Sequence, residues 1–110
     1  MKIILNDLPK ISLNKWYSGN HWTKRKEIKD TYKLIVKSQF KEVLSKGEIY
    51  NVTYEFGFKS RPLDTTNTCA MLKLIEDIIF EDDSYNIIPI ITIKSVKAKE
   101  DYVKIDIINK

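Results

Sequence analysis

Residues 61–85 constrain the fold more than any other stretch, because acidic side chains stand at both ends of a short helix-forming segment. Asp64 comes just after a strand-like run, and the acidic run Glu81-Asp82-Asp83 follows the helix. These carboxylates converge only if the fold returns the chain beside its starting point. Converging carboxylates would suit a divalent cation, since magnesium and manganese prefer hard oxygen ligands.

Both groups of acids also have ordinary structural explanations. An aspartate before a helix usually caps it by accepting a hydrogen bond from a backbone N–H of the first turn, and Asp64, Thr65 and Thr66 all suit that role. A run of acids after a helix is usually a solvated turn. This stretch alone leaves the cation site and the structural explanations both open.

The segment between the acids has the period of an amphipathic helix. At about 100° per residue, its apolar side chains fall on one arc. That arc holds Met71, Leu72, Ile75, Ile78 and Ile79. The opposite arc holds Ala70, Lys73 and Asp77. The pattern predicts one core face and one polar face.

A second helix is predicted earlier in the chain, with Thr23 as its N-cap and its end near Lys46-Gly47. The residues expected on its core face are Ile28, Tyr32, Ile35, Val36, Phe40 and Val43. A second stripe consists of Lys26, Lys29, Lys33, Lys37 and Lys41. A lysine stripe can follow a phosphate backbone, but it is also what a solvated helix face looks like, so both interpretations stay open.

Alternating apolar and polar residues predict the strands. The clearest strand covers residues 48–60, with Tyr50, Val52, Tyr54, Phe56 and Phe58 on one face. Residues 2–5, 87–96 and 102–108 are the other expected strands, and the last two are predicted to form an antiparallel hairpin. The element order β-α-β-α-β-β predicts an α+β fold, with two helices packed on a mixed sheet.

Residues 11–21 show no clear period and are predicted to form an ordered loop. Trp16 and Tyr17 in this loop either anchor it to the core or stack on unpaired bases.

The charge distribution favours a polyanionic partner. Residues 1–61 contain thirteen Lys or Arg and six Asp or Glu, a net +7, whereas the rest of the chain has a net charge of −3. This asymmetry suggests a basic surface beside an acidic site.

At 110 residues we expect a single domain, and one cysteine permits neither an internal disulfide nor a paired-cysteine zinc site. No apolar run is long enough for a membrane span or signal peptide, so we expect a cytoplasmic protein.

These features together resemble one known family. The segment LPKISLNKWY, the basic helix, the strand leading to Asp64, the helix segment K-L-I-E-D and the closing E-D-D-S are similar to the RusA family of Holliday junction resolvases, which is common in phages and prophages. The resemblance spans nearly the whole chain in order and spacing. It implies a homodimeric, magnesium-dependent endodeoxyribonuclease, with manganese as an alternative ion, that cuts four-way DNA junctions in recombination or repair within a bacterial host.

The resemblance also assigns roles to individual residues. Asp64, Lys73 and Asp83 match catalytic positions, and the implied metal ligands are Asp64, Asp83, Asp82 and Asp77. The helix that carries the lysine stripe and the residues beside Asp64 would contact the sugar-phosphate backbone of the DNA arms. The implied DNA-binding residues are Lys15, Lys26, Lys29, Lys33, Lys37, Lys59 and Arg61.

The sequence departs from the family pattern D-x-D-N at one ligand. Asp64 and Asn67 match its first and last positions, but Thr66 stands where the second aspartate would be. In addition, Lys73 comes three residues later after Asn67 than the family spacing gives. These departures support an alternative hypothesis: a RusA-like protein with weak or lost catalysis that binds branched DNA without cutting it.

Overall fold

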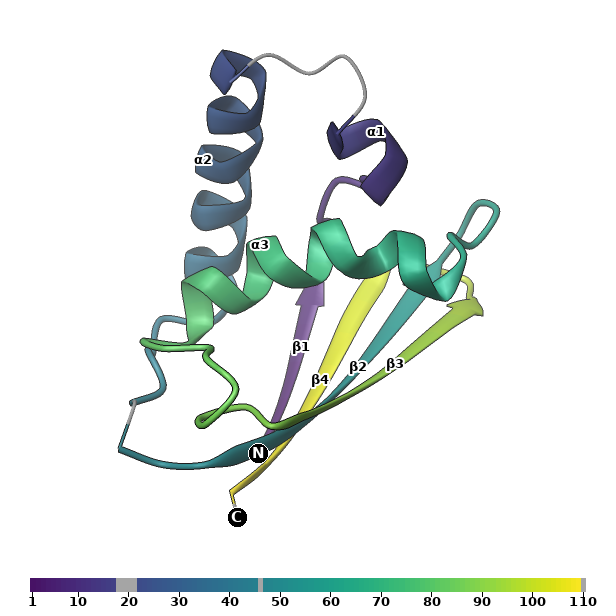
Figure 1. Cartoon of the computed structure of the whole chain (residues 1–110). Helices are drawn as coiled ribbons and strands as arrows, with labels where there is room; N and C mark the ends of the chain where they lie inside the picture. Colours follow the sequence, from purple (N-terminus) through teal and green to yellow (C-terminus); the bar gives the residue numbers. More distant parts are fainter. Residues whose placement is uncertain (18–21, 46, 110) are drawn as a thin grey trace.

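A four-stranded sheet with helices on one face forms the framework of the protein (Figure 1). The computed structural model describes residues 1–17, 22–45 and 47–109. The strands are β1 (Lys2–Asn6), β2 (Tyr50–Phe58), β3 (Ile90–Lys97) and β4 (Tyr102–Asn109). The helices are α1 (Leu13–Tyr17), α2 (Trp22–Gln39), the 3₁₀ helix η1 (Thr65–Thr68) and α3 (Cys69–Ile79).

The sheet is mixed, as expected, and its strand order is β1-β4-β2-β3. β2 pairs in parallel with β3, while β4 pairs antiparallel with both β1 and β2. The α+β class is therefore confirmed. The last two strands follow one another and run antiparallel, but β2 lies between them, so their hydrogen-bond partner is β2 rather than each other.

Parallel pairing of β2 and β3 explains the position of α3. Two neighbouring parallel strands need a crossover connection, which usually contains a helix packed on the sheet. Here η1 and α3 are that connection, and Figure 1 shows α3 crossing the sheet from one side to the other. The two ends of α3 consequently lie near opposite edges of the same sheet face.

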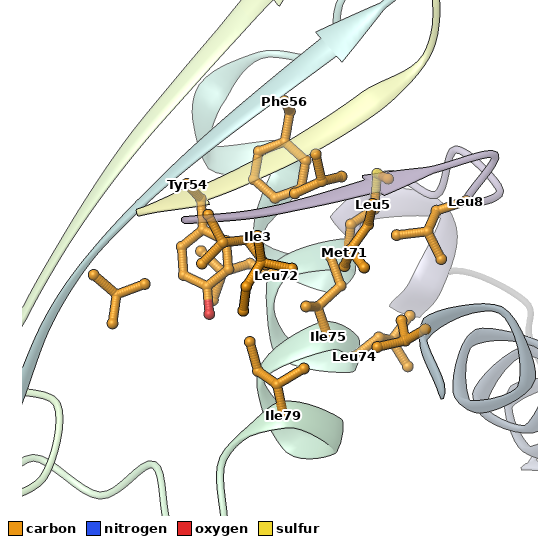
Figure 2. Packing of buried hydrophobic residues seen from close by; sticks show 14 of the residues in the cluster. Ile3, Leu5, Leu8, Tyr54, Phe56, Met71, Leu72, Leu74, Ile75 and Ile79 are labelled. Carbon is orange, nitrogen blue, oxygen red and sulfur yellow. The ribbon is translucent and has the colours of Figure 1, made fainter. Parts of the chain in front are cut away.

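The core lies between this helix and the sheet. All five inward residues expected on β2 are buried, and so are Val103, Ile105 and Ile107 of β4. Figure 2 shows Tyr54 and Phe56 of β2 and Ile3 and Leu5 of β1 beside the apolar face of α3. The labelled residues of that face are Met71, Leu72, Ile75 and Ile79. The alternation in the sequence correctly predicted this face.

The predicted extent of α2 was wrong. The helix begins at Trp22, which puts Thr23 inside its first turn, and it ends at Gln39 rather than near Gly47. After it, the backbone of Leu44 pairs with the segment after α3: its N–H donates to Ile79 O at 2.8 Å, and its carbonyl accepts from Glu81 N at 2.9 Å. This long-range pairing outweighs the helical period of residues 40–45 and leaves Val43 54% exposed.

The N-terminal loop is also more regular than expected. Leu13–Tyr17 form α1, and Ser12 starts it, since Ser12 Oγ accepts a hydrogen bond from Lys15 N at 3.1 Å. A five-residue helix is too short to show a 3.6-residue period, so the sequence pattern does not reveal it. Residues 18–21 of the predicted loop lie outside the described residues.

Close packing on the open face of the sheet depends on one glycine. A Cβ atom at Gly57 would lie 2.1 Å from the Tyr102 ring, so the ring occupies the space that any side chain at this position needs. The Tyr102 hydroxyl donates to Glu55 Oε2 at 2.7 Å, which holds the ring in place. The absence of a side chain at Gly57 of β2 therefore leaves room for the ring of Tyr102, its partner on β4.

We expect Gly57→Ala to lower the free energy of unfolding by about 1–3 kcal/mol, because the new methyl group overpacks the site. Urea denaturation measures this loss. Gly47→Ala is the matched control, since the nearest atom to its Cβ lies 3.9 Å away, and it should change little. If Gly57→Ala is as damaging in a Tyr102→Ala background, the tyrosine is not the cause.

Candidate functional site

The face of α3 that was predicted to be polar is only partly exposed to solvent in the folded protein. Ala70 is buried, because α1 packs against this part of α3. Glu76 is 4% exposed and accepts a hydrogen bond of 2.9 Å from the Tyr54 hydroxyl. A carboxyl group therefore lies between α3 and the sheet, where an unpaired charge would be costly.

Lys73 gathers three acids around it. Its Nζ lies 3.1 Å from Asp77 Oδ1, one turn along α3. It also donates to Asp83 Oδ2, which returns to the helix from the segment after it. The Glu76 carboxyl is in turn hydrogen-bonded to Asp83. We refer to Lys73, Glu76, Asp77 and Asp83 as the acid–lysine cluster.

Two carboxyl groups in the cluster have opposite ionisation behaviour. The hydrogen bond from Lys73 lowers the pKa of Asp83 below its usual value, so Asp83 is ionised at neutral pH. Burial raises the pKa of Glu76 to about 7, and its hydrogen bond to Asp83 adds to the shift. A protonated Glu76 can donate to the Asp83 carboxylate while accepting from Tyr54, which satisfies every group in this chain of contacts.

The charge on Lys73 is maintained by its acidic partners. Burial opposes that charge, but the hydrogen bonds to Asp83 and Asp77 outweigh burial, and the pKa of Lys73 is raised. With Glu76 protonated, one cation thus faces two carboxylates, and the cluster keeps a net negative charge.

A groove between α2 and α3 leads to this cluster. One cavity of about 410 Å³ has Lys33 and Lys37 of α2 in its lining together with Asp77. A second cavity, of about 240 Å³, has Lys29 in its lining with Lys73 and again Asp77. We call these adjoining cavities the lysine-lined groove. Three of the five lysines in the predicted stripe therefore lie beside the acidic residues.

The other predicted DNA contacts lie elsewhere. Lys26 pairs with Asp30 on the same helix at 3.0 Å, and Lys15 is exposed on α1. Lys59 and Arg61 are exposed at the end of β2, where their backbone carbonyls accept hydrogen bonds from Lys97 and Lys10. These two residues lie beside Asp64 rather than at the acid–lysine cluster.

Within the described residues, Asp83 pairs with Lys73, and no contact joins it to Asp64. Asp64 precedes η1, and the backbone rises roughly 14 Å along the η1–α3 axis between Asp64 and Lys73, the partner of Asp83. The neighbouring carbonyl of Leu63 accepts a hydrogen bond from Ser95 on β3, which fixes Asp64 at the start of the crossover. The parallel crossover carries the chain from the C-terminal end of β2 back to the N-terminal end of β3, so Asp64 stands before the η1–α3 segment and Asp83 after it.

The structural alternatives for the acids hold only in part. Asp64 stands at the N-cap of η1, but its side chain makes no capping hydrogen bond. Asp82, in contrast, supports its own turn, since Oδ1 accepts from Ser84 N at 2.9 Å. Thr66 is exposed in η1, and its carbonyl accepts from Cys69 N. Asp82 and Thr66 thus have local structural roles.

The donor set of the cluster fits magnesium in a limited sense. Within the described residues, no three or more His, Cys, Asp or Glu side chains are grouped to hold an ion. Magnesium, however, is usually bound through one or two carboxylates, with water and substrate phosphates completing its shell. Asp83 and Asp77 could supply that number if Lys73 turned toward a phosphate.

The burial of Glu76 is the feature of the site that the residue pattern did not reveal. The position of this residue between Ile75 and Asp77 suggests an ordinary polar helix residue. Only the pairing of α3 with β2 shows that it faces Tyr54. A hint was present in the sequence, because Tyr54 is a polar-tipped side chain on an otherwise apolar strand face and buried tyrosines usually find a partner.

Comparisons with known proteins assign no family to this chain. A scan against protein-family models found no match, and neither did a search of curated proteins. No helix in the described ranges is long and apolar enough to span a membrane.

We expect the stability of the metal-free protein to depend on pH through Glu76. Its pKa is raised from 4.5 to about 7 in the folded state, so its stabilising effect is complete below pH 4.5 and is lost as the pH rises through 7. Glu76→Gln keeps both hydrogen bonds without the charge. Relative to wild type, the variant should gain up to roughly 3 kcal/mol between pH 4.5 and pH 9.

Urea denaturation with a chelator present, at several pH values, measures this difference. Glu42→Gln, at an exposed position, is the control and should follow wild type. A constant difference between Glu76→Gln and wild type at all pH values would show that Glu76 titrates normally.

Proposed function

We propose that the protein is a magnesium-dependent, structure-selective endodeoxyribonuclease that acts on four-way DNA junctions. The observation that carries this proposal is the lysine-lined groove, whose lining includes Asp77 and also Lys73, the partner of ionised Asp83. Cations on α2 suit a phosphate backbone, and an acidic site beside them suits a metal-assisted attack on it. The resemblance to RusA resolvases, which rests on residues in the same region, supports the same function.

In this proposal each part of the site has a separate role. Lys29, Lys33 and Lys37 bind the DNA backbone, which favours branched shape over base sequence. Asp83 and Asp77 would hold magnesium, which when bound polarises a phosphoryl oxygen and lowers the pKa of a water. Lys73 offsets negative charge on the phosphate. A two-fold homodimer would present one such site to each cut strand of a junction with matching symmetry.

We expect the protein to nick a labelled synthetic four-way junction in magnesium or manganese. Asp83→Asn should reduce cutting at least a hundredfold while junction binding persists, because the substitution removes a charged ligand but not the lysines. Asp106→Asn, on the open face of the sheet, is the control and should cut normally. If the wild-type protein leaves junctions intact with both ions, the nuclease proposal fails.

Asp64→Asn, tested in parallel, shows which acids form the ligand set. If Asp83 and Asp77 suffice, this variant retains most of its cutting. Loss of cutting with intact binding would mean that the ligand set includes Asp64, which in one chain lies at the other end of the η1–α3 segment. The site would then have to combine Asp64 of one subunit with Asp83 of the other.

A second candidate function is binding of branched DNA without cutting. The position of Lys73 favours it, because its ammonium already contacts Asp77 and Asp83 and balances part of their charge. Thr66, which stands in place of a ligand aspartate, favours it as well. Junction binding with an unchanged affinity in chelator, and no product with either ion, would support this candidate over the first.

Both candidates require the lysine-lined groove to bind DNA. We expect a Lys33→Gln/Lys37→Gln variant to bind junctions more weakly and with a salt dependence whose slope is smaller by about 2, since each phosphate contact contributes about 0.9. Lys94→Gln/Lys104→Gln is the matched control, because both lysines stand on strand positions of the open sheet face. If both double variants lose the same junction affinity, the overall positive charge of the protein rather than the lysine-lined groove would account for binding.

A further inference from the structure

The cavity beside Lys29 and Lys73 has a composition unlike that of a simple phosphate-binding surface. It lies between α1, α2 and α3, with a volume of about 240 Å³. Apolar side chains of Leu13 and Leu74 and the aromatic side chains of Trp16 and Tyr17 line it, next to the two lysines. An apolar and aromatic cavity with cations beside it suits a flat ring that carries a phosphate.

The aromatic side chains of this cavity are already held in position. The Arg25 guanidinium lies 5.7 Å from the ring centre of Trp16 and 5.7 Å from that of Tyr17. Arg25 Nε also donates to the Trp16 carbonyl at 3.2 Å, which ties α1 to α2. A preformed aromatic wall lowers the entropy cost of binding a ring against it.

The size of the cavity limits its occupant. Sites that bury drug-sized ligands measure roughly 300–1,000 Å³, so this cavity suits a single ring system rather than a larger molecule. Its lining shares Asp77 with the cavity of Lys33 and Lys37. A DNA strand that follows the lysines of α2 would therefore pass the mouth of this cavity.

We propose that this cavity binds one unpaired nucleobase of the DNA strand that lies in the lysine-lined groove. The inference rests on the proposed function and refines it: the protein would recognise a branch point by an unstacked base as well as by backbone shape. Stacking of a base on an aromatic side chain tolerates any sequence, because every base has a π face. Lys29 would bind the adjoining phosphate.

Cys69 provides a direct test in the unmodified protein. It is the single cysteine of the chain, it is partly exposed, and it lines the cavity. The probes are a duplex with one unpaired thymidine and the same duplex with an abasic residue at that position. We expect the unpaired thymidine to slow alkylation of Cys69 by N-ethylmaleimide at least fivefold relative to the abasic duplex at equal saturation.

Affinity supplies a second readout. The thymidine duplex should bind about 5- to 100-fold more tightly than the abasic one, in line with the usual effect of one stacked base. Cys69→Phe fills the cavity and should equalise the two affinities. Leu34→Phe, on an exposed part of α2, should preserve the difference.

The outcomes separate this inference from the function on which it rests. Equal alkylation rates and equal affinities for the two duplexes, with junction binding intact, would overturn the base-binding cavity and leave the proposed function standing. Failure to bind junctions at all would overturn both. A thymidine preference that survives in Cys69→Phe would place base recognition outside this cavity.

Discussion

The parallel pairing of β2 with β3 is the constraint on which the rest of the structure depends. It requires a crossover, and the crossover helix α3 must pack across the sheet. This packing sets Glu76 against Tyr54 and presents Lys73 and Asp77 toward α2. Because the chain then returns to begin β3, Asp83 comes back to Lys73. The acid–lysine cluster is thus a consequence of the topology.

Burial and charge interact at this cluster. Burial of Glu76 favours its protonated form, and its hydrogen bond with Asp83 adds to that preference. Asp83, in contrast, stays ionised because of Lys73. The groove places lysines of α2 beside the negatively charged acid–lysine cluster. Ammonium groups that suit a phosphate backbone and carboxylate oxygens that suit a metal ion therefore occur on one surface. The proposed function follows from this proximity.

Much of the fold was predictable, because the alternation of apolar and polar residues along a strand indicates which side chains are buried. The inward residues of β2 and β4 were all correct, and so was most of the apolar face of α3. The end of α2 was not predictable, because the pairing of Leu44 with Ile79 and Glu81 joins distant segments. For the site, helical spacing correctly related Lys73 to Asp77. The separation of Asp64 from Asp83 depends on whether β2 and β3 run parallel, which a single strand pattern does not specify.

We propose that Asp83, together with Asp77, binds a divalent cation against DNA. The most direct measurement is paramagnetic broadening of backbone NMR signals by manganese in the complex with a four-way junction. We expect the signals of residues 73–77 and 83 to broaden first and those of exposed β4 residues to remain sharp. Broadening confined to residues 59–66 around Asp64, or none beyond that of free manganese, would contradict the central claim.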